Sequence, residues 1–128
     1  MNTMVKGIGI DILEIGRIQH SIDELGPNFL ERIFTPDEIR YCNSKHNAGQ
    51  HFAARFAAKE AVSKALATGW RGDFAWKDVE IMNDTLGQPH VTLYGRLKDA
   101  LAGASVFVSL SHSMSHVVAL VIIEGEIR

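Results

Sequence analysis

Residues 52–66 read FAARFAAKEAVSKAL, and this stretch decides the fold expected for the chain. Alanine, leucine, lysine, arginine and glutamate are strong helix formers, so the segment predicts a helix, which we place at residues 51–68. At about 100° per residue, its small residues form one wall, made of Ala54, Ala57, Ala58, Ala61, Val62 and Ala65. Small side chains on that wall predict close packing of the helix against a sheet.

The rest of this helix mixes charged and aromatic residues on one arc. The arc holds Phe52, Arg55, Phe56, Lys59, Glu60, Ser63 and Lys64. Glu60 and Lys64 are four residues apart in the order that favours an ordinary exposed ion pair. Arg55 and Lys59 have the same spacing, but both are cations and repel each other unless an anion lies between them. Cations grouped around one acid also suit a second interpretation, a site for phosphate and Mg²⁺.

A second acid suited to such a site lies in the first strand, predicted at residues 5–15. The alternation places Ile8, Ile10 and Ile12 on one face and Gly7, Gly9 and Asp11 on the other. Glycines leave space for a backbone or a ligand to approach, and the Asp11 carboxylate beside that space could hold a divalent cation. The alternative, which spacing alone favours, is that Asp11 caps the next helix or lies exposed at the end of the strand.

The remaining pattern predicts an α+β chain in which helices follow the first strand and a sheet follows the helices. Thr35-Pro36-Asp37-Glu38 is a capping box with proline at the first helical position. Gly26-Pro27 ends the first helix. The predicted helices besides 51–68 are 16–25, 36–44 and 96–102. The predicted strands besides 5–15 are 79–83 and 90–94, which form a hairpin, followed by 106–111 and 117–124.

Composition indicates an ordinary globular protein. The 128 residues suffice for a single domain, 1–128, with its own core, and 46% of them are hydrophobic and 22% charged. No apolar run approaches the roughly 20 residues of a membrane span, and no secretory signal is evident. The lone Cys42 excludes an internal disulfide and fits a reducing compartment, so a cytoplasmic location is expected. The net charge of −2 argues against a dedicated nucleic-acid binder.

The third candidate position is His112, at the end of the predicted strand 106–111. It could act as a general base, bind a phosphate or be a hydrogen-bonded structural histidine, and an isolated histidine at a strand end favours the structural role. The chain contains no Gly-x-Ser-x-Gly elbow, Walker loop or third glycine of a dinucleotide fingerprint, and its histidines lack zinc spacing.

Several motifs together resemble those of the holo-[acyl-carrier-protein] synthases, which are small 4′-phosphopantetheinyl transferases. The two most specific are GIGIDILEIGRI at 7–18 and RFAAKEAVSKA at 55–65. The others are FTPDE at 34–38, LGQP at 86–89 and VSLSHS at 108–113. The resemblance covers nearly the whole chain. It implies the fold of that family, α+β with an antiparallel sheet packed against a long central helix.

The resemblance also implies a reaction and its catalytic residues. Such enzymes move the 4′-phosphopantetheine group of coenzyme A to a serine of apo acyl carrier protein in fatty acid biosynthesis, and release adenosine 3′,5′-bisphosphate. Asp11 and Glu60 would be the Mg²⁺ ligands, and the metal would bind the pyrophosphate of coenzyme A. Lys64 would stabilise the same phosphates and the leaving group. Asp11 acting through a metal-bound water is one candidate for the base that takes the serine proton.

Further contacts follow from the family pattern. Arg55 and Lys59 would serve other phosphates of coenzyme A, including the 3′-phosphate. His112 would lie by the cofactor across a subunit interface, because the family is typically a homotrimer with active sites between protomers. Arg17 matches the basic position that meets the acidic recognition helix of the carrier protein.

Two other functions remain open from the residues alone. One is a different Mg²⁺-dependent enzyme that transfers phosphate or cleaves pyrophosphate with the same acids. The other is a module that binds coenzyme A without turnover. Asp11, Glu60 and Lys64 together disfavour the binding module, because binding alone does not require a pair of metal ligands.

Overall fold

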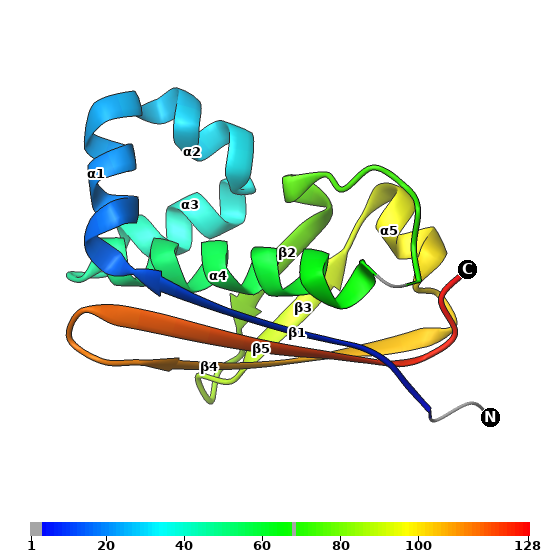
Figure 1. The fold of residues 1–128 in the computed structure, drawn as a ribbon. Helices are drawn as coiled ribbons and strands as arrows, with labels where there is room; N and C mark the ends of the chain where they lie inside the picture. The colour runs from blue at the N-terminus through cyan, green and yellow to red at the C-terminus, as the bar shows by residue number, and fades with distance from the viewer. Residues whose placement is uncertain (1–3, 68) are drawn as a thin grey trace.

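The computed structural model describes residues 4–67 and 69–128, in which a first strand is followed by a run of helices, a pair of strands, a short helix and two further strands (Figure 1). The helices are α1 (Ile15–Leu25), α2 (Pro27–Ile33), α3 (Pro36–Asn43), α4 (Ala48–Leu66), the 3-10 helix η1 (Trp76–Asp78) and α5 (Gly95–Ala100). The strands are β1 (Val5–Glu14), β2 (Val79–Asn83), β3 (Pro89–Leu93), β4 (Ala104–His112) and β5 (His116–Gly125). Among the described residues, no helix is long and apolar enough to cross a membrane.

The strands form a three-stranded antiparallel sheet in the order β1-β5-β4 and a separate antiparallel hairpin, β2-β3. Helix α4 runs along one face of the larger sheet, and α1, α2 and α3 lie on the side of α4 away from that sheet, toward the N-terminal end of α4 (Figure 1). Helix α5 lies toward the C-terminal end of α4, whereas the tip of the hairpin lies near the N-terminal part of α4 and the end of β4. The predicted α+β fold, with an antiparallel sheet packed against a long central helix, is therefore confirmed.

Glycines in β1 and alanines in α4 explain why the helix lies so close to the sheet. A Cβ atom on Gly7 would be 2.0 Å from the carbonyl oxygen of Ala65, and one on Gly9 would be 1.8 Å from that of Ala61. Ala61 and Ala65 are themselves fully buried. The space beside Asp11 is thus filled by the backbone of α4, and this contact brings the two elements that carry Asp11 and Glu60 together.

The predicted boundaries need three corrections. Helix α4 begins at Ala48 rather than at residue 51 and ends at Leu66, while the predicted last residue, 68, lies outside the described residues. The prediction missed α2: Gly26-Pro27 ends α1, but Pro27 also occupies the first turn of a new helix, where proline is favoured. The other elements differ from their predicted limits by two residues or fewer.

The opposite face of the larger sheet is apolar and exposed. Ile8, Ile10 and Ile12 are 63%, 58% and 65% exposed, and Phe107 on β4 is 54% exposed. In the strand register, these three isoleucines pair with residues 122, 120 and 118 of β5, so the apolar surface continues across the sheet. We call it the outer sheet face. The described helices lie on the other side (Figure 1), and a contiguous apolar patch of this kind typically marks an interaction surface.

Candidate functional site

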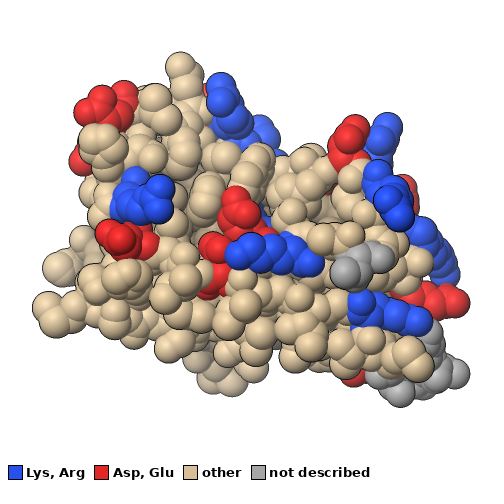
Figure 2. Space-filling view, viewed as in Figure 1, with Lys and Arg blue, Asp and Glu red and all other residues tan. Residues whose placement is uncertain are grey.

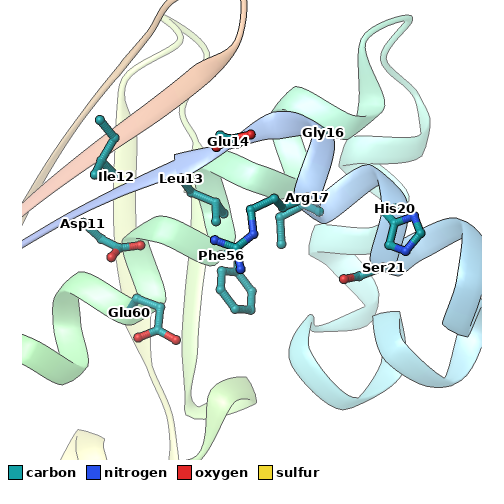
Figure 3. Close-up of a pocket in the computed structure, with 11 residues that line it drawn as sticks. Asp11, Ile12, Leu13, Glu14, Gly16, Arg17, His20, Ser21, Phe56 and Glu60 are labelled. Atoms are coloured by element: carbon teal, nitrogen blue, oxygen red, sulfur yellow. The ribbon is translucent and has the colours of Figure 1, made fainter.

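A cavity of about 660 Å³ lies where β1, α1 and α4 meet. Asp11 from β1 and Glu60 from α4 both line it, together with Arg17 from α1. In Figure 3 the two acidic side chains lie next to each other on one side of the cavity, and Arg17 extends toward its middle. Figure 2, which is viewed from the same side as Figure 1, shows acidic and basic side chains together near the centre of the molecule, over α4 and β1. The structure thus unites two acids that are far apart in sequence.

The electrostatics of this acid pair favour a bound cation. Partial burial raises the pKa of Glu60 above its usual range, the negative charge of Asp11 raises it further, and Lys64 opposes both effects. A raised pKa at one of two neighbouring acids means that two negative charges repel each other in a partly desolvated site. A divalent cation between them would remove this repulsion.

Lys64 forms its contacts with β1. Its Nζ atom lies 3.0 Å from Oδ1 of Asp11 and donates to the carbonyl oxygen of Ile10 at 3.0 Å. The alternative of an exposed Glu60–Lys64 ion pair is therefore wrong. The alternative of a capping role for Asp11 is also wrong, because Glu14 is the N-cap residue of α1 and no side chain caps it.

The carboxylates of Asp11 and Glu60 suit Mg²⁺ better than a structural zinc ion. Among residues 4–67 and 69–128, no group of three or more His, Cys, Asp or Glu side chains could hold a metal ion. Two carboxylates leave most of a coordination shell to other ligands. Mg²⁺ is commonly bound in this way, through one or two carboxylates, several waters and the phosphates of a substrate. A structural zinc site needs four protein ligands, and these residues do not provide them.

Lys59 does not face the acid pair. Its Nζ atom lies 2.8 Å from Oε1 of Glu38, and both side chains are fully buried. It also donates to the backbone carbonyls of Trp76 and Val79. This lysine joins α4 to α3 and β2, so the structure contradicts its expected role in binding the cofactor.

Arg55 and His112 do come together, but in a second cavity of about 240 Å³ between α4, the tip of the β2-β3 hairpin and the end of β4. The Arg55 side chain stacks on the ring of Tyr41 at 4.5 Å and donates to Oδ1 of Asn83 at 3.0 Å. Its Nε atom is buried and has no hydrogen-bond partner among the described residues. The two cavities share no lining residue. The residues predicted to share one arc of α4 therefore face different neighbours: Glu60 lines the first cavity, Arg55 lines the second, and Lys59 is buried against Glu38.

Phe56 and His51, which the sequence did not mark as site residues, also line these cavities. Phe56 lines the first cavity one turn before Glu60 and stacks on Trp76 with ring centroids 5.1 Å apart. His51 lines the second cavity one turn before Arg55. The four-residue spacing on one helix was the available signal in both cases. This spacing identifies cavity residues only when the elements that face each side of α4 are known.

Comparison with known proteins identifies the family of this chain. Residues 7–121 match the family described as the 4′-phosphopantetheinyl transferase superfamily. A holo-[acyl-carrier-protein] synthase of Koribacter versatilis is 48% identical over 124 residues, which cover 94% of this chain and 99% of that protein.

Solved structures show the same similarity. The crystal structure of the Neisseria meningitidis holo-[acyl-carrier-protein] synthase has a TM-score of 0.85 at 35% identity and covers 94% of this chain and 99% of its own. A Bacillus anthracis holo-(acyl-carrier-protein) synthase, solved in complex with CoA (3′,5′-ADP), has a TM-score of 0.79 at 36% identity, with 96% and 99% covered. The chain therefore belongs to the 4′-phosphopantetheinyl transferase superfamily and, within it, to the holo-[acyl-carrier-protein] synthases.

Proposed function

We propose that this chain transfers the 4′-phosphopantetheine group of coenzyme A to a serine of apo acyl carrier protein and releases adenosine 3′,5′-bisphosphate. The observation that carries this proposal is the meeting of Asp11 and Glu60 in one cavity, with Lys64 bonded to Asp11. We place the reaction in fatty acid biosynthesis and in the cytoplasm. The buried free thiol of Cys42 is in keeping with a reducing compartment.

The transfer depends on Mg²⁺ in this proposal. Asp11 and Glu60 would hold the ion, which, when bound, neutralises the pyrophosphate of coenzyme A and draws charge from the phosphorus under attack. Lys64 is 53% exposed at its side chain and has a flexible stem, so it can turn from Asp11 toward a phosphate oxygen. Its role is to stabilise negative charge on the departing phosphate.

The decisive experiment is mass spectrometry of apo acyl carrier protein incubated with the chain, coenzyme A and Mg²⁺. The expected result is a gain of one phosphopantetheine group on the carrier, and no gain with EDTA or with a carrier whose acceptor serine is replaced by alanine. If coenzyme A is cleaved while a competent carrier keeps its mass, the chain is a pyrophosphate-cleaving enzyme instead. If coenzyme A binds and stays intact, the chain is a binding module.

We further propose that the active sites form between the protomers of a homotrimer. The cavity with Asp11 and Glu60 and the cavity with Arg55 and His112 share no lining residue. One coenzyme A molecule could contact both sets if a neighbouring protomer supplied the second. The outer sheet face is the surface available for this contact, because its isoleucines are more than half exposed and their burial would be favourable.

Ile10→Lys is expected to disrupt the trimer. A charged side chain in the middle of the outer sheet face would have to be desolvated on association. Size-exclusion chromatography with light scattering should then show monomers and a large loss of transfer activity. Leu86→Lys is the matched control, because Leu86 is 91% exposed in the turn between β2 and β3 and is not part of the larger sheet. A trimer of unchanged mass in the Ile10 variant would refute this interface.

Arg17 is the proposed contact for the carrier protein. It lines the cavity that contains Asp11 and Glu60 and is exposed on α1, so an acidic helix docked there would bring its serine to the metal site. Helix α1 also carries the acids Asp23 and Glu24, and Asp23 accepts a hydrogen bond from Gln19 at 2.9 Å. Glu24 remains exposed and His20, which lines the same cavity, can add positive charge only when protonated.

Arg17→Glu should raise the KM for the carrier protein by about tenfold or more, because it replaces attraction with repulsion at the edge of an interface. The KM for coenzyme A should change little. Steady-state kinetics with each substrate varied in turn will separate the two effects. Arg32→Glu is a suitable control, since it makes the same change of charge in α2. An equal rise in both KM values for the Arg17 variant would contradict the docking role.

A further inference from the structure

His51 lies on α4 one turn before Arg55, and its side chain lines the second cavity together with Arg55 and His112. We propose that His51 is a further phosphate-binding residue of this cavity and that its imidazole takes up a proton when the anion binds. The inference rests on the proposed function, because the anion is the phosphate monoester at the 3′ position of coenzyme A.

The groups around His51 are all neutral or basic. Tyr41 of α3 contacts its ring edge-on, with ring centroids 5.8 Å apart, and Lys45, in the connection between α3 and α4, lies over the Tyr41 ring at 4.9 Å from its centroid. Arg55 approaches from the same helix and His112 from β4. None of the described residues that line the cavity is acidic. Basic groups from three elements therefore converge without a counterion from this part of the chain.

Arg55 provides the second indication that an anion belongs here. Its side chain is 1% exposed, it forms no ion pair with any described acid, and its Nε–H group is left without a partner. A buried charge is costly unless it is paired. A phosphate monoester would supply the missing negative charge, and arginine and histidine are well suited to donate hydrogen bonds to its oxygens.

The direction of the proton linkage follows from the same surroundings. Burial lowers the pKa of His51 below its usual value, and the positive charges of Arg55, Lys45 and His112 lower it further. In the free protein these effects favour the neutral imidazole of His51. A dianion beside it would favour the protonated form and raise the pKa. The affinity for the phosphate monoester should consequently increase as the pH falls through the pKa that His51 has in the complex. It should level off below the pKa that His51 has in the free protein.

The test is calorimetric titration of the protein with adenosine 3′,5′-bisphosphate, and with 5′-AMP as the ligand that lacks the 3′-phosphate. Measurements in two buffers of different ionisation enthalpy report the protons taken up on binding. For the unmodified chain we expect uptake with the bisphosphate that 5′-AMP does not reproduce. His51→Gln should remove most of that uptake and weaken bisphosphate binding about tenfold at pH 6.5, equivalent to about 1.4 kcal/mol.

Two further variants keep the test decisive. His112→Gln shows which histidine takes up the proton, because the His51-dependent part of the uptake should persist in it. His51→Phe preserves an aromatic ring against Tyr41, so loss of uptake in this variant too cannot be attributed to a collapsed α3–α4 contact. The free bisphosphate has the same second ionisation near pH 6 in every titration, so a difference in proton uptake between variants reflects the bound state.

The inference and the proposed function fail in different ways. Proton uptake that is unchanged in both His51 variants would refute the role of His51, even while phosphopantetheine transfer to the carrier proceeds normally. If His51→Gln weakened the binding of 5′-AMP and of the bisphosphate by the same factor, the role of His51 would also be refuted. The 3′-phosphate would then not be the group that His51 recognises. An absence of transfer by the unmodified chain would instead refute the function.

Discussion

Glu60→Gln is expected to lower the rate of phosphopantetheine transfer by more than about 100-fold, which is the upper end for groups that merely support a metal ligand. Glutamine preserves the shape of the side chain but removes the charge that the cation requires. Asp11 would then remain as the one acid of the pair, and its Oδ1 atom is already bonded to Lys64. The transfer rate should be measured by mass spectrometry of the carrier across a range of Mg²⁺ concentrations.

The variant should keep its fold. The pKa of Glu60 is raised in the folded chain by burial and by Asp11, so ionised Glu60 opposes folding at any pH above that pKa. Removing the charge should therefore leave the Tm unchanged or slightly higher when Mg²⁺ is absent. Added Mg²⁺ should raise the Tm of the unmodified chain but not that of the variant. Glu31→Gln, an exposed acid of α2, is the control for the loss of one negative charge.

The same pKa predicts how metal binding depends on pH. Mg²⁺ binds the ionised carboxylate, so its affinity should fall as the pH drops through the pKa of Glu60, which lies above the ordinary glutamate value of 4.5. The rise of Tm with Mg²⁺, measured between pH 4.5 and 8, will follow this titration. A transfer rate or Mg²⁺ response in Glu60→Gln equal to that of the unmodified chain would remove Glu60 from the metal site.

Lys59→Met is expected to produce the largest loss of stability, about 3–5 kcal/mol in the free energy of unfolding. The ammonium group pairs with Glu38 at 2.8 Å, and both side chains are fully buried. Its removal leaves the Glu38 carboxylate with the backbone N–H groups of Thr35 and Ile81 but no cation. Such a loss is a large share of the roughly 5–15 kcal/mol that stabilises a typical domain. Urea unfolding at fixed protein concentration measures it.

Lys64→Met is a close control, since it makes the same substitution on the same helix at a side chain that is 53% exposed. An exposed ion pair contributes about 0–1 kcal/mol, so this variant should unfold almost as the unmodified chain does while losing transfer activity. The double variant Lys59→Met/Glu38→Gln should cost less than the sum of its two single changes, because the residues interact directly. A Lys59 variant as stable as the Lys64 variant would show that the buried pair contributes little.

Neighbouring residues of α4 thus have different roles: one stabilises the fold and the next lines the proposed active site. Lys59 and Glu60 are adjacent in sequence, yet the first is fully buried against α3 and β2 and the second lines the large cavity. Adjacent helical residues point about 100° apart, so one helix can face its core and its site within a single turn. The Lys59→Met and Glu60→Gln variants test these two roles separately.

The sequence by itself determined the contact between β1 and α4. Gly7 and Gly9 face Ala61 and Ala65, and only residues of this size permit the observed approach. It also determined the capping box at the start of α3, where Thr35 and Glu38 bond to each other's backbone N–H groups. Such features depend on local geometry or on residue size, so short stretches are sufficient to predict them.

The tertiary structure alone decided how the charged arc of α4 is divided. Helical periodicity gives the direction of each side chain around the axis, but not the element that it meets. Packing of α3 and β2 against α4 buries Lys59 on Glu38 and places Arg55 on Tyr41, whereas β1 leaves Glu60 beside Asp11. These neighbours come from positions far along the chain, and only their packing separates a stabilising ion pair from a site for phosphate.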